Sequence, residues 1–352
     1  MNFLKVPKKN KIKFVLLGSG KPLCDLCDLL IKNKFVKPII VTHPKRFHKR
    51  DEKLLSHSKT YSSVFEYSKK NNIELIQAEK VNDAKLIMLL CKKKCSAAFS
   101  ISCRSIIKKP FLDAFNGLVF NIHPAYLPEE RGGAIISWRI LNNKKYVAAT
   151  LHQIDEGIDS GPIIIQKKKK LNIRNPFLED YILQTNDLYI KLFSIFIQKL
   201  GSKLELKSQN QKRASYYSRL YTEINGAIDW NWSNVEIESF INAFGSPYPG
   251  AFTFLNNKKI SILEGKSEKS NEQFHPFLYG RIIQKFQDDS VRVVTKKGFL
   301  RIKKIAINGT ITSPSEILQL GNILYTPSEV LHESKTKITN VRNMKAKFEN
   351  KK

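Results

Sequence analysis

Short apolar runs alternate with longer amphipathic stretches through the first half of the chain. The runs predict buried strands, because four to six consecutive apolar residues suit a strand covered on both faces. They cover residues 12–17, 39–42, 73–76, 97–101 and 118–122. Strands that alternate with helices predict an α/β fold with a parallel sheet, and they place the site at the carboxyl ends of the strands.

The second half changes its pattern. Residues 177–200 carry apolar positions at helical spacing and predict a long helix that closes the first domain. Ser233 is the expected N-cap of a short helix over 235–244. Alternating segments then predict strands at 251–255, 290–295 and 299–305. With Gly298 in a hairpin turn, these strands are expected to close into a small β barrel.

A chain of 352 residues is long enough for two compact domains with extensions. We expect a basic leader at 1–11, a catalytic domain at 12–200, a polar linker at 201–220 and a β domain at 221–320. The basic tail, 321–352, is expected to be disordered because it combines many lysines with mixed turn signals.

Polar residues gather at one predicted strand end. Asn121 and His123 lie two positions apart at the end of the run 118–122, so a strand points both to one face. Asp159 follows in a turn after an alternating segment, 146–154, that predicts a neighbouring strand. Each residue alone is more often a turn former or a satisfied polar group. Together they suit one reaction centre, in which the carboxylate orients or charges the imidazole.

Such a centre suits the attack of an amine on a carbonyl carbon. An amide donor such as Asn121 can stabilise the developing oxyanion, an effect of about 10²–10³ in rate. His123 can supply a second donor or take the amine proton, and the residues leave His123, Asp159 and a water open as the proton acceptor. Cys103 has no adjacent base, and no serine lies in a nucleophile-elbow context, so direct transfer between two bound substrates is expected.

Three motifs occur in order: Asn-Ile-His at 121–123, Leu-Pro-Glu-Glu-Arg-Gly at 127–132 and Asp-Glu-Gly-Ile-Asp-Ser-Gly at 155–161. They resemble those of the 10-formyltetrahydrofolate-dependent formyltransferases, the family of the methionyl-tRNA and sugar-amine enzymes. The resemblance covers roughly residues 11 to 310. It implies a Rossmann-like formyltransferase domain followed by a small OB-like β-barrel domain. It also implies that Asn121, His123 and Asp159 form the catalytic set.

The resemblance also implies a folate donor site. The segment 99–104 is similar to the family loop whose backbone binds the pterin ring, although it also suits an ordinary strand end. With the later loop, it gives the candidate residues Ile101, Ser102, Cys103, Asp155 and Gly157. The implied co-substrate is 10-formyltetrahydrofolate.

Metal and dinucleotide sites are not expected. The pairs Cys24/Cys27 and Cys91/Cys95 lack a second pair of ligands at zinc-site spacing, so packing or inert exposure is the favoured interpretation. The Gly-Ser-Gly at 18–20 lacks the rest of the dinucleotide fingerprint and predicts a tight strand-to-helix turn.

Five cysteines, an odd number, favour free thiols in a reducing compartment. No run of 18 apolar residues occurs, and the first 11 residues lack a signal-peptide core. We therefore expect a cytoplasmic protein without membrane insertion. The sequence leaves open whether the protein forms a homodimer.

The net charge of +29 is compatible with a polyanionic partner, either tRNA or a nucleotide-linked substrate. The lysines are spread along the whole chain, however. Dense runs at 45–53, 92–94 and 167–170 are more typical of solvated faces than of nucleic-acid sites.

The acceptor amine is the least determined part of the resemblance. Residues 42–50 are basic but lack the glycines of the Gly-Arg-Gly-Lys loop that the tRNA enzymes carry. Trp138 stands where the tRNA enzymes continue Ala-Ala-Pro-Ile-Gln, which is closer to the sugar-amine enzymes, although it equally suits a helix core. The resemblance therefore favours a nucleotide-linked amino sugar over initiator methionyl-tRNA, with Arg131 and Trp138 as acceptor-binding candidates.

Two other classes remain as alternatives. Related formyltetrahydrofolate hydrolases share the Asn-x-His core, although they carry a regulatory module ahead of the catalytic domain, and here the first strand is predicted from residue 12. The charge alone would also suit a catalytically idle RNA-binding protein. The Asn, His and Asp together favour an enzyme over that alternative.

Overall fold

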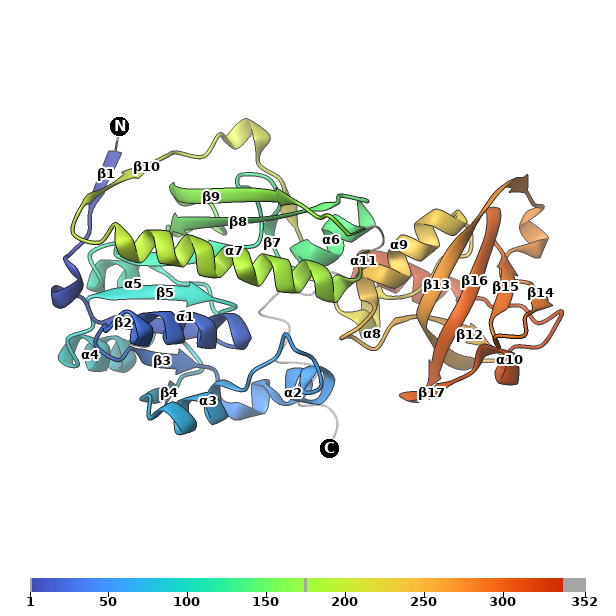
Figure 1. Ribbon diagram of the computed structural model, residues 1–352, viewed down its shortest axis with the longest axis horizontal. Coiled ribbons are helices and arrows are strands. Elements are labelled where there is room, and N and C mark those ends of the chain that lie inside the picture. The colour runs from blue at the N-terminus through green and yellow to red at the C-terminus, as the bar shows by residue number, and fades with distance from the viewer. Residues whose placement is uncertain (1, 174–175, 338–352) are drawn as a thin grey trace. The chain divides into compact units, whose positions relative to one another are not determined.

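The computed structural model describes residues 2–173 and 176–337 and divides into two compact units. The first unit contains the chain up to Ile135 together with Tyr146–Asn172 and Tyr181–Tyr217. The second contains Ile136–Lys145, Ile173–Asp180 and the chain from Ser218 onward. Both units are drawn in Figure 1.

The first unit is built on a seven-stranded sheet with the order β4-β3-β2-β5-β6-β8-β9. Its strands are β2 (Phe14–Gly18), β3 (Ile39–Thr42), β4 (Leu75–Gln77), β5 (Ala97–Ile101), β6 (Val119–His123), β8 (Tyr146–Gln153) and β9 (Ile163–Lys170). The strands from β4 to β6 run parallel, whereas β8 and β9 are antiparallel to their neighbours. The predicted α/β fold is confirmed, and strand ends are shifted by one or two residues at most.

Helices cover both faces of this sheet. They are α1 (Lys21–Lys32), α2 (Lys49–Leu55), α3 (Val64–Asn71), α4 (Ala84–Lys92), α5 (Lys109–Ala114) and α7 (Leu178–Gln198). Phe193 and Phe196 of α7 pack against Phe99 of β5, and Figure 1 shows α7 lying along the sheet. On the other face, α4 and α5 bury Leu90 and Phe111 against the sheet. The apolar runs therefore form strands because both of their faces are covered.

The leader and the linker are more ordered than their composition predicts. β1 (Asn2–Lys5) pairs with β10 (Lys203–Leu206), and β7 (Arg131–Gly132) pairs with β11 (Tyr216–Tyr217). The expected leader and polar linker thus contribute strands to the first unit. Leu204 of β10 is buried, and the backbone groups of these segments are satisfied by strand pairing, a long-range feature that composition does not report.

The second unit contains an antiparallel sheet with the order β12-β13-β16-β15-β14, and β17 pairs with β16. Its strands are β12 (Ala251–Leu255), β13 (Lys258–Gln273), β14 (Ile282–Lys285), β15 (Val291–Val294), β16 (Lys297–Ile307) and β17 (Thr310–Thr312). Isolated bridges join Ile323 to Arg281 and Tyr325 to Phe254, so one segment links both edges of the sheet. This arrangement is barrel-like, as predicted.

Five helices belong wholly or mainly to the second unit: α6 (Ile135–Leu141), α8 (Thr222–Asn225), α9 (Asn234–Phe244), α10 (Pro314–Ile317) and α11 (Ser328–Thr336). Ser233 is the N-cap of α9, as predicted, and forms a capping box with Glu236. Gly298 lies inside β16 with a φ of 69°, just after the turn in which it was predicted.

The segment from 321 to 337 is also ordered, contrary to the predicted disorder of the tail. Asn225 Nδ2 donates to Ser334 O at 2.8 Å, and Lys335 Nζ pairs with Asp229 Oδ2 at 2.9 Å. These partners are about a hundred positions away in sequence, so local composition could not reveal them. The remaining part of the predicted tail, 338–352, lies outside the described residues.

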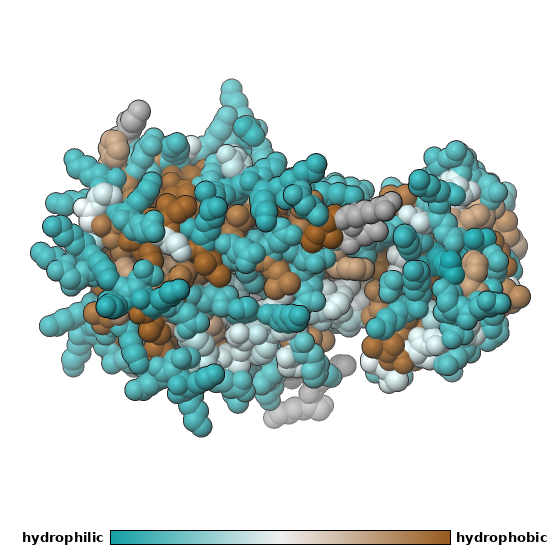
Figure 2. Space-filling view, viewed as in Figure 1, coloured by the Kyte–Doolittle hydropathy of each residue, from teal (hydrophilic) through white to brown (hydrophobic). Residues whose placement is uncertain are grey.

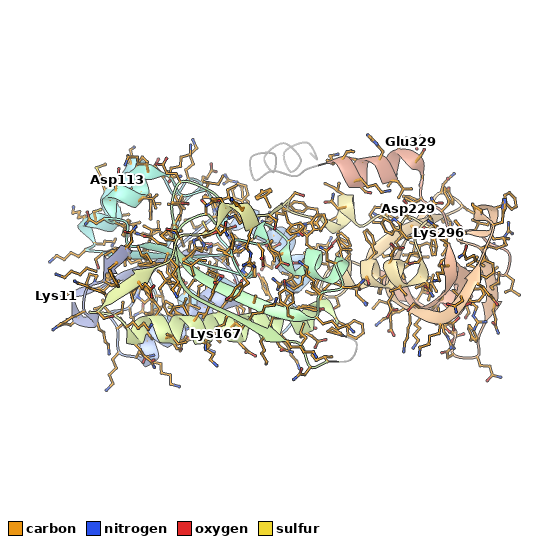
Figure 3. The ribbon with its side chains drawn as sticks, turned by 90° about the horizontal axis from the view of Figure 1, so that it is seen from above. Lys11, Asp113, Lys167, Asp229, Lys296 and Glu329 are labelled. Carbon is orange, nitrogen blue, oxygen red and sulfur yellow. The ribbon has the colours of Figure 1, made fainter. Side chains whose placement is uncertain are left out.

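Hydrophilic residues dominate the face drawn in Figure 2, as the charged composition predicts. Lysines are found on both units, including Lys11 and Lys167 on the first and Lys296 on the second, all labelled in Figure 3. Within residues 2–173 and 176–337, no helix combines the length and apolar character needed to cross a bilayer.

Candidate active site

The Asp159 carboxylate lies at the centre of the candidate site, in the loop between β8 and β9. Its Oδ2 accepts a hydrogen bond from the backbone N–H of Gly132 at 2.9 Å and lies 3.4 Å from His123 Nδ1. Its Oδ1 lies 3.4 Å from Asn121 Nδ2 and 3.8 Å from His152 Nε2. The three residues that the sequence predicts as catalytic therefore meet at one carboxylate, and His152 joins them.

His123 is the last residue of β6, and its side chain is buried. Its Nε2 lies 2.7 Å from the carbonyl oxygen of Glu130, and a carbonyl can only accept, so Nε2 carries a hydrogen. Nδ1 then faces Asp159. A hydrogen on Nδ1 would point to the Asp159 carboxylate, which can accept it.

His152 is a site residue that sequence reasoning missed. It lies on β8 directly opposite Asn121 in the antiparallel register, and it is almost fully buried. Its Nδ1 lies 2.9 Å from Gln153 O and must donate, which leaves Nε2 to accept from Asn121 Nδ2 at 3.1 Å. Burial lowers the pKa of His152, partly offset by the nearby Asp159 charge. The signal in the sequence was a histidine within a predicted strand that neighbours Asn121.

The Asn121 amide is thereby fixed between two acceptors. One of its hydrogens points to His152 Nε2 at 3.1 Å and the other to Asp159 Oδ1 at 3.4 Å. The second distance is long for a hydrogen bond, so that hydrogen is the easier one to redirect to a substrate oxygen. His152 thus orients the Asn121 amide, and the weaker contact with Asp159 leaves the second amide hydrogen available to a substrate oxygen.

We expect His152 to make the protein less stable in acid. The pKa of His152 is lowered in the folded state, so its contribution is complete above the unfolded value near 6.5 and is lost as the pH falls below it. Urea unfolding between pH 8 and pH 5 should therefore show a steeper loss of stability for the wild type than for His152→Gln. Equal slopes would show that the ring is not buried in its neutral form.

The predicted donor loop follows β5, the parallel neighbour of β6. Ser100 pairs with Asn121 in the parallel register, so Ile101, Ser102 and Cys103 begin next to Asn121. Ser102 has a φ of 53°, which turns the chain sharply there. Burial raises the pKa of the Cys103 thiol to about 11, so the thiol stays protonated near neutral pH and is a poor nucleophile.

Asp155 and Gly157 shape the loop that carries Asp159. Asp155 Oδ1 accepts from the backbone N–H of Gly157 at 3.1 Å and from Ser160 Oγ at 2.7 Å. A Cβ on Gly157 would lie 2.1 Å from Ser160 Oγ, so the turn has no room for a side chain there. The two residues fix the loop conformation, and their assignment to the folate site stays a prediction.

The two acceptor candidates belong to different units. Arg131 donates from Nε and Nη2 to Gln209 Oε1 at 3.2 and 2.7 Å, and from Nη1 to Gln211 Oε1 at 3.1 Å. Trp138 lies half-buried on α6, and its Nε1 donates to Ser218 O at 2.8 Å. Both side chains are engaged with their own unit, so their acceptor roles stay predictions. Across residues 2–173 and 176–337, no three His, Cys, Asp or Glu side chains form a group that could hold a metal ion.

Comparison with known proteins identifies the family. The formyl transferase family model matches residues 10–179, and the model of the formyl transferase C-terminal domain matches residues 221–320. Methionyl-tRNA formyltransferase of Clostridium tetani is 27% identical over 298 residues, which are 84% of this chain and 91% of that protein. The bifunctional polymyxin resistance protein ArnA of Wigglesworthia glossinidia brevipalpis is 31% identical over 214 residues, 58% of this chain but 31% of that longer protein.

Among solved structures, the N-formyltransferase of Helicobacter canadensis in complex with folinic acid and dTDP-3-aminofucose aligns with a TM-score of 0.60. It is 24% identical, and the alignment covers 83% of this chain and 98% of that one. At this identity the likeness concerns the fold. With both of its domains matched, the chain belongs to the formyltransferase family of enzymes, which transfer formyl groups.

Proposed function

We propose that this enzyme moves the formyl group of 10-formyltetrahydrofolate to the primary amine of a nucleotide-linked amino sugar by direct attack. The observation that carries the chemistry is the Asp159 carboxylate, which faces the Asn121 amide and the His123 imidazole at 3.4 Å each. That spacing lets both donors turn from the carboxylate to a substrate oxygen. No covalent nucleophile is needed.

In the proposed step, the protons are exchanged among the two substrates, His123 and Asp159. The amine nitrogen bonds to the formyl carbon while Asn121 and His123 donate to the carbonyl oxygen, where charge develops. Asp159 takes the proton that the amine loses, and His123 gives a proton to the departing folate nitrogen. A final proton transfer from Asp159 to His123 Nδ1 restores the starting pair.

The loop after β5 suits the formyl donor in this scheme. When bound, the folate supplies an activated formyl group on nitrogen. Gly18 allows the backbone of β5 to close up against β2, since a Cβ on Gly18 would lie 1.8 Å from Ile101 O. The residues Ile101 to Cys103 thus form a fixed backbone edge beside Asn121, and they would hold the pterin through main-chain groups.

The choice of a sugar acceptor is supported by the basic segment after β3. His48 is buried there, with Nε2 lying 3.0 Å from His43 O, and Arg104 pairs with Asp51 and donates to Phe47 O at 2.9 Å. The segment is therefore folded back onto its own unit. Two of its cations also form ion pairs: Arg46 with Glu79 and Arg50 with Asp51. Lys45, Arg46 and Lys49 stay exposed, so the support for a sugar comes from these local contacts and not from burial of the charge.

Initiator methionyl-tRNA is the second candidate acceptor. It is favoured by the net charge of +29 and by the relatives with that name, which align with this chain over most of their length. A polyanion of that size would contact many of the dispersed lysines, so its binding would weaken steeply with salt.

Parallel assays with each acceptor distinguish the two proposals. Purified enzyme receives 10-formyltetrahydrofolate together with either nucleotide-linked amino sugars or charged initiator tRNA, and release of tetrahydrofolate is followed at two salt concentrations. We expect turnover with a sugar and none above the acceptor-free rate with tRNA. Turnover with charged tRNA alone would refute the sugar proposal, and release without any acceptor would indicate a hydrolase.

A further inference from the structure

Gln209 makes hydrogen bonds to both segments that surround the Asp159 carboxylate. It lies between β10 and the short 3-10 helix Gln211–Arg213, and it is 8% exposed. Its Nε2 donates to the backbone oxygens of Asp159 and Gly161 at 2.9 and 2.7 Å. Its Oε1 accepts from Arg131 Nε and Nη2. The side chain therefore uses its two amide hydrogens and its oxygen to join the loop 155–161 to β7.

These contacts hold Asp159 from two directions. Asp159 has a φ of 52°, a left-handed conformation that residues other than glycine seldom adopt and that surrounding contacts must maintain. Gln209 fixes its backbone oxygen directly. Through Arg131, it also fixes the residue next to Gly132, whose N–H donates to Asp159 Oδ2. Loss of Gln209 would thus loosen both the backbone and the carboxylate of Asp159.

We propose that Gln209 is a positioning residue for formyl transfer: it keeps the Asp159 carboxylate aligned with His123 and Asn121 without contacting either substrate. This inference rests on the proposed function, because Asp159 is the catalytic group that Gln209 serves. A misplacement of about 1 Å at a reacting group costs about 10²-fold in rate, so the effect should fall on the chemical step.

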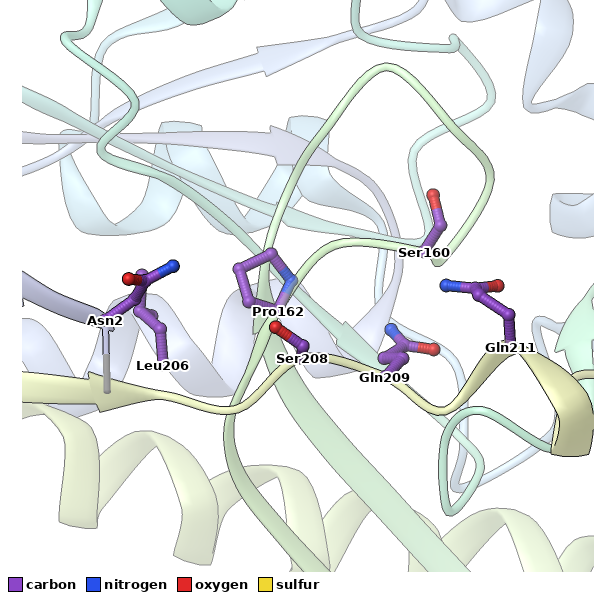
Figure 4. Close-up of a pocket in the computed structure, with 7 residues that line it drawn as sticks. All are labelled: Asn2, Ser160, Pro162, Leu206, Ser208, Gln209 and Gln211. Atoms are coloured by element: carbon purple, nitrogen blue, oxygen red, sulfur yellow. The ribbon is translucent and has the colours of Figure 1, made fainter.

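The surroundings of Gln209 allow a clean substitution. Its side chain lines an open, solvent-facing pocket together with Ser160, Pro162 and Gln211, as Figure 4 shows. A glutamate in its place has nearly the same shape, and its charge would lie beside Arg131. It still accepts from Arg131, but it cannot donate to the two backbone oxygens. The Gln209→Glu variant therefore removes the hold on the Asp159 loop and keeps the contact with Arg131.

Gln211 offers a matched control. It is exposed, and its Oε1 accepts from Arg131 Nη1 at 3.1 Å. Within the part of the chain that the structure describes, its side chain makes no hydrogen bond to the loop 155–161. Like Gln209→Glu, Gln211→Glu replaces an amide beside Arg131 by a carboxylate. It leaves the hydrogen bonds from Gln209 to Asp159 and Gly161 intact.

The test compares the full-length wild type, Gln209→Glu and Gln211→Glu in two measurements. Steady-state kinetics should show kcat lowered about 10²-fold in Gln209→Glu with both KM values changed less than about threefold, and near-normal kcat in Gln211→Glu. The ring resonances of 13C-labelled His123, assigned from a His123→Gln spectrum, should shift in Gln209→Glu alone, because Asp159 has moved.

The resonance measurement needs no turnover, so it separates this inference from the proposed function. If the wild type lacks activity but the His123 resonances shift, the proposed function fails while the positioning role holds. Unchanged kcat and unchanged His123 resonances in Gln209→Glu would overturn the inference. If that variant does not fold by circular dichroism, Gln209→Met, an apolar side chain of similar length, applies the same criteria.

Discussion

We expect the Asp159→Asn variant to lose about 10²–10⁴-fold in turnover while keeping its fold. Asparagine has the same shape, but it carries no negative charge beside the His123 ring and cannot take the proton of the attacking amine. It would also place an amide where two donors, from His123 and Asn121, now face an acceptor. Single-turnover release of tetrahydrofolate at saturating substrates measures the loss.

Asp113→Asn is the control for this prediction, because Asp113 is an exposed carboxylate on α5 whose partner is Lys109 of the same helix. Its turnover should match that of the wild type. A near-normal rate in Asp159→Asn would remove Asp159 from the mechanism and leave Asn121 and His123 to carry it.

We expect Phe193→Ala to lower the free energy of unfolding by about 3–5 kcal/mol, a large part of the roughly 5–15 kcal/mol of a typical domain. Phe193 of α7 is fully buried, and its ring centroid lies 4.9 Å from that of Phe99 and 6.4 Å from that of Phe14. Alanine would leave a cavity between α7 and the sheet that these rings cannot fill by collapse.

Urea denaturation followed by circular dichroism measures this loss. Phe3→Ala is the matched control, since Phe3 lies on β1 of the same unit and is 55% exposed. Its effect should stay within about 0.5 kcal/mol. Equal midpoints for the two variants would show that the α7 contact contributes little to stability.

Strand β6 was predictable because its signal is local. An apolar run that ends in Asn121 and His123 indicates both the strand and the common face of the two side chains, and β6 covers Val119–His123. The long helix was predictable in the same way, from apolar residues at helical spacing, and α7 spans Leu178–Gln198. In these cases the physical cause of the structure, burial of one face or both, is written in neighbouring residues.

His152 and Gln209 could not be recognised in this way. The role of His152 depends on the antiparallel register between β6 and β8, which places it opposite Asn121. Gln209 lies in a segment whose polar composition is typical of a flexible linker, and its partner Asp159 is 50 positions away. Such partners are fixed by strand pairing and loop contacts, which leave no periodic trace in the sequence.

In the proposed mechanism, the formyl group passes directly from the folate donor to an amine at Asn121, His123 and Asp159. Donor carrying a 13C-labelled formyl group, incubated with enzyme and a nucleotide-linked amino sugar, tests it most directly by mass spectrometry and 13C NMR. We expect the label to appear as a formamide on the acceptor amine, with one labelled formamide for each tetrahydrofolate released. Label recovered as free formate, or retained on the donor while the amine stays unmodified, would contradict it.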